Sequence, residues 1–409
     1  MIDWKKVKLK DCCHSISDGD HLPPPKSNSG VPFVTIANID ATNHIDFGNT
    51  MFVPLEYYNN LNDIRKAKCN DILYSVVGSF GKPVLIKENI PFAFQRHIAI
   101  LRPNNEIADS RFLYYVMLTR DFFMQADTVA IGAAQRTISL TALRNMEVKL
   151  PSMETQYRIA SILSRYDSLI ENYQKQIKLL EEAAQRLYKE WFVDLHFPGH
   201  ENAKIVDGVP EGWEKKTIDD VTCKVTTGLN PRKNFVLGKG SNYYVTIKNM
   251  ADNTLFLDDR CDRVDNEALE KINKRSDLKI GDILFSGIGT IGRVALVDIP
   301  TNNWNVSESV FTLRVNDIVT KEFLYLMLLS PDMQNYCQSN AHGAAQKGIR
   351  MADLKAYSFN LPPFGVIQKF TNLVTPTIKK VSSIRNQIRL LTEARDRLLP
   401  RLMNGEIAV

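Results

Sequence analysis

The sequence lacks three features that would each point to a particular class of protein. No apolar run approaches the roughly 20 residues of a membrane helix. The first residues, MIDWKKVKLKDCC, lack the apolar centre of a secretory signal. Six cysteines without a CxxC pair indicate neither a disulfide framework nor a paired zinc motif. We therefore expect a reduced, cytoplasmic protein without a membrane segment.

Composition excludes disorder but gives no argument for nucleic-acid binding. Hydrophobic residues make up 44% and charged residues 24% of the 409, a globular balance with room for two or three domains. The formal net charge is +5, and the whole excess lies within residues 362–409. Bulk charge therefore does not indicate that the rest of the chain binds DNA.

The chain contains an internal repeat with a shift of about 211 residues. The matched segments are VTI at 34 and 245, DIL at 71 and 282, FLY at 112 and 323, GAAQ at 132 and 343, LP at 150 and 361, and Trp4 with Trp213. The period is too long for a solenoid, so each copy is a domain with a further segment attached. Two such copies can pack as the two subunits of a dimer do.

Each copy predicts an α+β domain followed by a long helix. Residues 72–86, ILYSVVGSFGKPVLI, indicate two strands around a glycine turn, and 112–125, FLYYVMLTRDFFMQ, indicate a helix. The second copy repeats both patterns at 281–297 and 322–336. We predict globular domains at 1–150 and 213–361, helical regions at 151–192 and 362–409, and a Pro- and Gly-rich linker at 193–212.

Both helical regions carry apolar residues at alternating steps of four and three, which favours a coiled coil. The first series is Ile159, Leu163, Tyr166, Ile170, Tyr173, Ile177, Leu180, Ala184, Leu187 and Trp191. The second is Phe370, Val374, Thr377, Val381, Ile384, Ile388, Leu391, Arg395, Leu398 and Leu402, where Pro376 is expected to kink or start the helix. Each helix has the other as its natural partner. A length of about 50–60 Å corresponds to about 15–18 base pairs.

Motifs for catalysis or metal binding are weak. Residues 81–83 and 238–240 lack the spacing and the Ser or Thr of a phosphate-binding loop, and 360–364, NLPPF, inserts a leucine into an adenine-methyltransferase pattern. GIGTIG at 287–292 fits a dinucleotide motif only if a helix follows, whereas 293–297 favours a strand. Cys12, Cys13, His14 and His21 have no second ligand pair, so no metal is expected.

The order of these parts resembles the specificity subunit of Type I restriction–modification enzymes. The resemblance covers essentially the whole chain and rests on the Trp4 and Trp213 openings, GDIL with GTIGR, GAAQ before a basic residue, LPS or LPP closing each domain, and RLYKEWF followed by FPG. It implies two target recognition domains, each reading half of a bipartite, gapped DNA site. It also implies that the helices pair antiparallel, set the gap and dock two DNA methyltransferase subunits.

The resemblance further implies a chain that is itself non-catalytic. S-adenosylmethionine, ATP and Mg²⁺ would be bound by the methyltransferase and restriction/translocase subunits of a phage-defence complex, and not by this chain.

Candidate DNA contacts follow from the chemistry of base readout and phosphate binding. The shared pair is Gln135–Arg136 and Gln346–Lys347, with local structural bonding as the alternative. The remaining candidates are Lys26, Lys82, Arg96, Arg232, Lys233, Lys239 and Arg293. Basic residues of the last helix are expected to face partners or solvent rather than DNA.

Two other functions remain open from the sequence. The segments 14–30 and 223–242 differ between the copies, whereas the scaffold segments agree. Such divergent loops on a shared scaffold also fit a two-domain protein-interaction scaffold without DNA readout. A nucleotide-dependent enzyme built on GIGTIG is the third hypothesis, and it requires a helix after those glycines.

Overall fold

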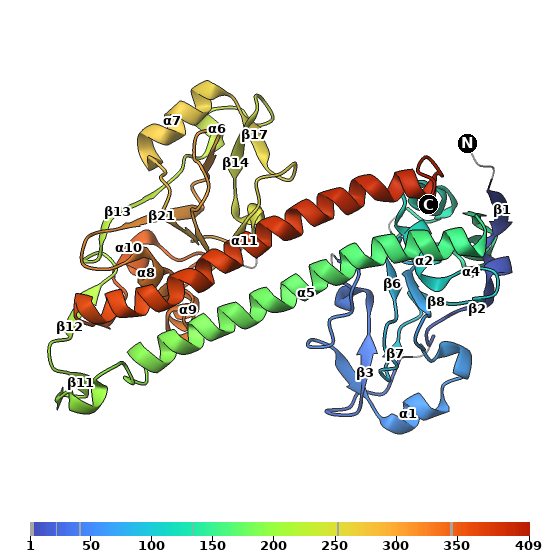
Figure 1. Ribbon diagram of the computed structural model, residues 1–409, viewed down its shortest axis with the longest axis horizontal. Coiled ribbons are helices and arrows are strands. Elements are labelled where there is room, and N and C mark those ends of the chain that lie inside the picture. Colours follow the sequence, from blue (N-terminus) through green and yellow to red (C-terminus); the bar gives the residue numbers. More distant parts are fainter. Residues whose placement is uncertain (1–3, 22, 41, 134, 252, 344–346) are drawn as a thin grey trace. The chain divides into compact units, whose positions relative to one another are not determined.

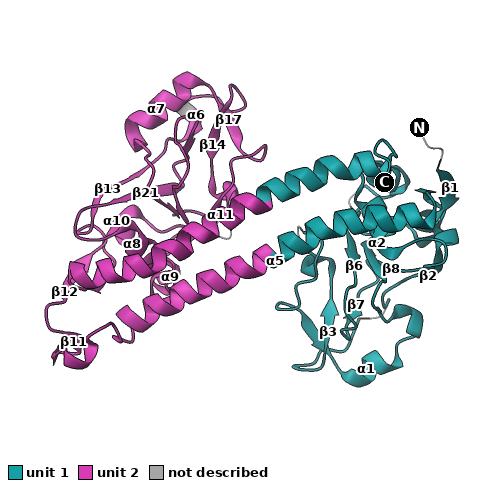
Figure 2. Ribbon diagram, in the orientation of Figure 1, with its two compact units in different colours: residues 1–172, 389–409 teal, residues 173–388 magenta. Residues whose placement is uncertain are grey.

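The computed structural model describes residues 4–21, 23–40, 42–133, 135–251, 253–343 and 347–409, apart from the side chain of Lys233 (Figure 1). The chain forms two compact units (Figure 2). Unit 1 comprises Met1–Asn172 and Arg389–Val409, and unit 2 comprises Tyr173–Ile388. Each unit therefore contains one globular domain and part of both long helices.

Unit 1 contains a four-stranded antiparallel sheet in the order β2-β8-β5-β6, a three-stranded sheet in the order β4-β3-β7, and the pair β1-β9. The strands are β1 (Lys5–Lys8), β2 (Cys13–Asp18), β3 (Val31–Val34), β4 (Met51–Val53), β5 (Ile72–Ser75), β6 (Pro83–Leu85), β7 (Ala93–Phe94), β8 (Ile98–Pro103) and β9 (Glu147–Leu150). The helices are α1 (Leu55–Asn60), α2 (Ser110–Leu118), α3 (Arg120–Val129), α4 (Leu140–Asn145) and the first half of α5 (Met153–Phe192).

Unit 2 repeats this topology with the sheets β13-β21-β18-β19, β17-β14-β20 and β12-β22, and adds the hairpins β10-β11 and β15-β16. Its strands are β10 (Ile205–Val206), β11 (Val209–Pro210), β12 (Glu214–Thr217), β13 (Thr222–Thr227), β14 (Asn242–Val245), β15 (Met250–Ala251), β16 (Thr254–Leu255), β17 (Asp262–Val264), β18 (Ile283–Ser286), β19 (Val294–Leu296), β20 (Trp304–Val306), β21 (Val310–Val315) and β22 (Ser358–Leu361). Its helices are α6 (Pro231–Asn234), α7 (Asn266–Ser276), α8 (Lys321–Leu328), α9 (Pro331–Ser339), α10 (Met351–Lys355) and most of α11 (Phe364–Met403).

The central strand of each large sheet is buried on both faces, which explains its unbroken apolar sequence. In unit 1, Ile72 and Tyr74 of β5 join the core that includes the long helices, while Leu73 joins the core under the three-stranded sheet. In unit 2, Phe285 and Leu284 of β18 divide between two cores in the same way. The repeated DIL segment therefore links the two layers of each domain.

The repeated aspartate of this segment holds a buried ion pair. Asp71 lies under Arg102, with Arg102 Nη2 2.9 Å from Asp71 Oδ2, and Asp282 pairs with Arg314, with Nε 2.7 Å from Oδ1. Both carboxylates are nearly inaccessible to solvent. The repeated DIL segment is thus a structural element common to both copies.

The prediction of one helix at 112–125, and of its counterpart at 322–336, is wrong because each segment forms two helices. Thr119 has extended backbone angles and its Oγ1 accepts the N–H of Phe122, so it ends α2 and caps α3. In the second copy Ser330 caps α9, and Pro331 occupies the first position of that helix.

The two long helices pair antiparallel, and the pairing can be followed separately in each unit. In unit 1, Arg395 of α11 reaches Asp167 of α5 at 2.7 Å. In unit 2, Arg385 of α11 reaches Glu181 of α5 at 2.5 Å. The positions on α11 decrease as those on α5 increase, as an antiparallel coiled coil requires.

Pro376 does not start its helix, because α11 already begins at Phe364 and continues through the proline. A proline inside a helix removes one backbone hydrogen bond. Thr375, the residue directly before the proline, donates its Oγ1 hydrogen to the carbonyl of Thr371 at 2.7 Å. Within the described residues, no helix is long and apolar enough to cross a bilayer.

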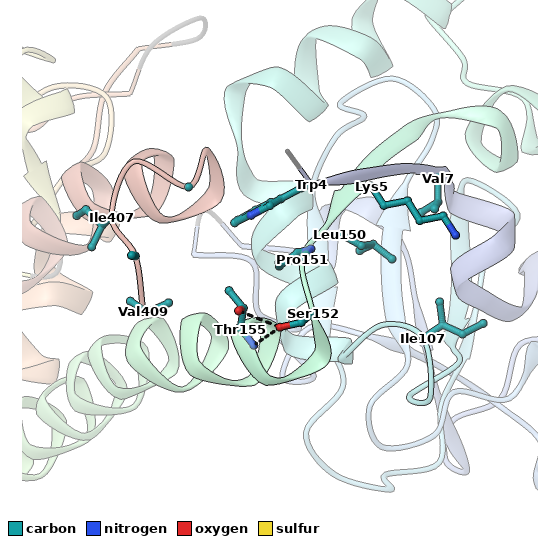
Figure 3. A pocket seen from close by; sticks show the side chains of 12 residues that line it. Trp4, Lys5, Val7, Ile107, Leu150, Pro151, Ser152, Thr155, Ile407 and Val409 are labelled. Carbon is teal, nitrogen blue, oxygen red and sulfur yellow. Dashed lines mark hydrogen bonds between the residues drawn. The ribbon is translucent and has the colours of Figure 1, made fainter. Parts of the chain in front are cut away.

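Unit 1 is closed by the last residues of the chain. A cavity of about 550 Å³ is lined by Trp4, Leu150 and Pro151 on one side and by Ile407 and Val409 on the other (Figure 3). In unit 2 the equivalent Trp213 packs against the linker ring of Phe197 and against Phe192. The segment 404–409 thus occupies for Trp4 the place that the linker occupies for Trp213.

Candidate nucleic-acid interface

The clearest structural difference between the copies lies in the loops that lead into the three-stranded sheets. In unit 1 the β2–β3 loop spans 19–30 and α1 covers this sheet, whereas unit 2 has the β13–β14 loop at 228–241, which contains α6, and the longer α7. A Cβ at Gly19 would lie 2.1 Å from the Phe94 carbonyl oxygen, and one at Gly228 would lie 1.5 Å from that of Val306. Glycine is therefore required where each loop begins.

A tyrosine hydroxyl holds the beginning of each loop. In unit 1, Tyr57 of α1 donates to Asp20 Oδ2 at 2.5 Å. In unit 2, Tyr244 of β14 approaches the Leu229 carbonyl oxygen at 2.7 Å and Glu308 Oε2 at 3.1 Å. Burial raises the pKa of both phenols, so they remain neutral donors. The two loops start from similar anchors made by different residues.

Candidate cations of these loops are exposed where the structure describes them. Lys26 lies in the β2–β3 loop, and Arg96 flanks its base, since the Arg96 N–H donates to the Asp20 carbonyl at 3.1 Å. Arg232 in α6 and Lys239 are exposed in the β13–β14 loop. Lys233 belongs to α6, but its side chain lies outside the described residues. Each loop thus presents positive charge to solvent.

The described residues that flank each GAAQ segment are hydrogen-bonded to the glycine hairpins. Gly132 and Gly343 adopt φ of 105° and 107°, a region that favours glycine. The carbonyls of Arg136 and Lys347 accept N–H bonds from Gly78 and Gly289 at 2.9 and 2.7 Å. The described ends of the two loops therefore match in backbone angle and in bonding to the hairpin.

The side chains of these loops differ in their exposure and in their local bonding. Gln135 and Lys347 are exposed, whereas Gln346 lies outside the described residues. The guanidinium of Arg136 is bonded to Asp127 and stands over the Phe80 ring, 5.4 Å from its centre. Arg136 is thus engaged in the local bonding that was the alternative to a DNA contact.

Lys82 and Arg293 occupy equivalent positions and make equivalent bonds. Lys82 Nζ donates to the Ile39 carbonyl at 3.4 Å, and Arg293 donates to the carbonyls of Ile247, at 3.0 Å, and Met250. Ile39 and Met250 are themselves related by the repeat. These two cations join the glycine hairpin to the neighbouring loop in both units.

The glycines at 287–292 form the turn between β18 and β19, which pair antiparallel. A strand thus follows them, as the sequence predicted, in place of the helix that a dinucleotide site needs. Phe80, Gly81 and Lys82 follow the same course between β5 and β6.

Every predicted seam residue of α5 and α11 is buried or half-buried. Several bulky apolar residues beside them, among them Leu179, Leu373 and Leu390, are about half exposed or more. Among the cations of the last helix, Arg385, Arg389, Arg395 and Arg401 form ion pairs: Arg389 lies 2.7 Å from Glu393, and Arg401 lies 3.7 Å from Glu406. The helix surfaces thus combine a closed seam with exposed apolar and charged positions.

The described residues give little support for a reactive thiol or a metal site. All six cysteines are free, and burial raises the pKa of the Cys12 and Cys337 thiols to about 11 and about 12. Such thiols stay protonated at neutral pH and are weak nucleophiles and ligands. Within the described part of the chain, no three His, Cys, Asp or Glu side chains gather as a metal site.

Sequence reasoning missed the residues that anchor the loops and domains, notably Tyr57, Tyr244, Glu308 and Glu171. Their partners lie far away along the chain, and no spacing rule connects them. One sequence signal could have marked the start of each variable loop. Glycine recurs at 19 and 228, with the same shift of 209 residues that relates Trp4 to Trp213.

These features define a class of protein: two copies of one α+β domain with different loops, carried on paired helices. The family model of the Type I restriction modification DNA specificity domain matches residues 1–182 and again 210–388. The chain belongs to this family, whose members are the non-catalytic specificity subunits of Type I restriction–modification systems.

Individual relatives support this assignment. The chain is 28% identical to the MjaIX specificity subunit of Methanocaldococcus jannaschii, over 73% of the chain and 69% of the relative. It is 25% identical to the HindI specificity subunit of Haemophilus influenzae over the full length of both. The S subunit from M. genitalium shares its fold, with a TM-score of 0.61, 18% identity and coverage of 98% and 96%.

Proposed function

We propose that each globular domain reads one half of a bipartite, gapped DNA site in the major groove. The paired helices would fix the gap and dock two DNA methyltransferase subunits. The chain itself would supply recognition without catalysis.

The observation that carries this proposal is the contrast between constant scaffold and variable loops. Both copies keep the buried Asp–Arg pair, the glycine hairpin and the GAAQ loop. They differ in the β2–β3 and β13–β14 loops and in the helix that covers each three-stranded sheet. Different loops on one scaffold are what two different half-sites require.

The chemistry of the variable loops is compatible with duplex DNA. Lysine and arginine bind phosphate, and arginine can also bind the guanine edge in the major groove. Lys26 and Arg96 offer such groups in unit 1, and Arg232 and Lys239 offer them in unit 2. Gln135 on its GAAQ loop adds an exposed amide of the kind that pairs with adenine.

The remaining partners follow from the family. A complete complex would combine this chain with two methyltransferase subunits and with restriction/translocase subunits. S-adenosylmethionine, ATP and Mg²⁺ would be bound by those partners, because the glycine hairpins of this chain lead into strands rather than phosphate-binding helices.

A map of N6-methyladenine in source cells with and without this gene tests the proposal. Loss of one bipartite motif is the expected result. Replacing residues 1–150 with the domain of a relative should then change one half-site and keep the other. A change in both halves would contradict the two-reader arrangement, and an unchanged map together with salt-insensitive DNA binding by the assembled complex would favour the interaction scaffold.

A further inference from the structure

A contact between the globular domain and the long helix recurs in both units at positions related by the repeat. In unit 1, Lys87, in the loop after β6, forms an ion pair with Glu171 of α5. In unit 2, Ser382 of α11 donates a hydrogen bond to Asp298, in the loop after β19. A shift of 211 carries Lys87 onto Asp298 and Glu171 onto Ser382.

The chemistry of the contact has changed between the copies while its place has been kept. A cation and a carboxylate meet in unit 1, and a carboxylate and a hydroxyl meet in unit 2. Residues that merely decorated a surface would have no reason to remain complementary after both partners changed. In each unit the two partner residues therefore match each other, although neither residue type is kept between the copies.

Unit 1 reinforces this contact from a second loop. His44 Nε2 lies 3.1 Å from the same Glu171 oxygen that binds Lys87. The loop of His44 is held by Asp40, whose carboxylate accepts the His44 N–H at 2.9 Å. Glu171 thus receives two groups from two separate loops of the globular domain.

The contact stands beside the ion pair that joins the two helices. The repeated tyrosine of the FLY segment lies at this junction in both units. Tyr114 is close to Asp167 and Arg395, and Tyr325 is close to Arg385, the partner of Glu181. Domain and helices are therefore connected at one polar junction in each unit.

We propose that these junction contacts fix the angle at which each recognition domain leaves the helices, and so determine how strictly the protein selects the gap between half-sites. Lys87, His44, Glu171, Asp298 and Ser382 would be positioning residues that do not touch DNA. The inference rests on the proposed function and adds a second determinant of the gap to helix length.

The test uses the complete complex with its methyltransferase subunits and S-adenosylmethionine. Methylation is measured on duplexes with the native gap and with gaps one base pair shorter or longer. Glu171→Gln and Ser382→Ala should each raise the ratio of altered-gap to native-gap methylation by about two- to five-fold, as expected for loss of a partly exposed polar contact. Preference for the half-site sequences should not change.

Two controls separate positioning from general destabilisation. Glu154→Gln removes an ion pair with Arg158 that lies within α5 alone, and should leave the ratio unchanged. Lys87→Met combined with Glu171→Gln should raise the ratio by less than the two single effects combined, because both substitutions remove the same contact.

An unchanged ratio in Glu171→Gln, or a change confined to half-site preference, would overturn the inference while leaving the two-reader function intact. A native complex that methylates every gap equally would overturn the proposed function itself. The two failures are therefore distinguishable in one data set.

Discussion

At the scale of single residues, the contact between His44 and Glu171 predicts a pH dependence. The hydrogen bond that His44 donates to Glu171 raises the pKa of His44, and the bonds that Glu171 accepts from His44 and Lys87 lower the pKa of Glu171 to about 2. The folded protein therefore binds the His44 proton more tightly than the unfolded chain does. This contribution to stability is complete below about pH 6.5 and is lost as pH rises through the raised pKa.

The measurement is the urea midpoint of unit 1 in the native protein and in His44→Gln between pH 6 and 9. The native protein should be more stable at pH 6, and the difference should shrink toward pH 9. Glu171 acts in the opposite window, since its contribution is present above about pH 4.5 and is lost at lower pH. A difference that grows with rising pH would contradict the assignment of the proton to His44.

The buried pairs of Asp71 with Arg102 and of Asp282 with Arg314 predict a large cost for removing the arginine. Arg102→Ala leaves a nearly inaccessible carboxylate without its partner, which should cost about 3–5 kcal/mol. Hydrogen exchange should show the loss in unit 1, and Arg314→Ala should show it in unit 2. Lys6→Ala, which removes an exposed pair with Glu147, should cost less than about 1 kcal/mol.

At the scale of elements, apolar patterning was enough to predict the strands around the glycine hairpins and the seam of the long helices. It could not predict the break at Thr119, because a cap between two apolar stretches depends on one hydroxyl and on local backbone angles. Nor could it pair Glu171 with His44, which lies 127 residues away along the chain. A periodic pattern of apolar residues predicts which face of a helix or strand is buried. Polar contacts between distant segments follow no sequence period, so such a pattern does not predict them.

Pro376 allows a test of α11. It is exposed within the helix, so Pro376→Ala introduces no clash and restores one backbone hydrogen bond. The variant should be more stable by up to about 3 kcal/mol in unit 2, measured by denaturant unfolding. Lys379→Ala on the same helix serves as a control and should change stability little. A loss of stability in Pro376→Ala would mean that the proline shape is required by packing.

If the helices fix the gap, as proposed, their length predicts the gap itself. Seven residues inserted after Asn172 in α5 and after Ile388 in α11 keep the seam in register, because seven is the heptad period. Each helix then gains a rise of about 10.5 Å, so the preferred gap should grow by about three base pairs. Insertion in α5 alone should instead disrupt pairing and abolish methylation. An unchanged gap in the double insertion would reject the helices as the determinant of spacing.

At the scale of the whole molecule, each unit is assembled from distant parts of the chain. The core of unit 1 combines Ile159 and Leu163 of α5 with Leu402 and Met403 of α11. The core of unit 2 combines Tyr188 of α5 with Phe370 of α11 and includes no described residue beyond Ile388. Unit 1 therefore comes first along the chain, but its core is completed by residues that come after unit 2.

A truncation after Ile388 tests this arrangement. Loss of the Leu402 and Met403 side chains removes roughly 3–6 kcal/mol of apolar burial from unit 1, a large part of the stability of a domain. Hydrogen exchange should show unit 1 opening while the sheets of unit 2 stay protected. Truncation after Met403 keeps both side chains but removes the segment beside Trp4, and should destabilise unit 1 much less than truncation after Ile388. Equal loss in both units would contradict the division at residues 172 and 388.

Closure of unit 1 by residues 389–409 also has a consequence for synthesis on the ribosome. The N-terminal domain emerges first, yet its apolar helix face stays uncovered until the whole of unit 2 has been translated. Unit 2 can complete its own core earlier, as soon as residue 388 has left the exit tunnel. The nascent chain thus finishes its second domain before its first, and during that interval the uncovered face of unit 1 is the part most exposed to aggregation and to chaperones.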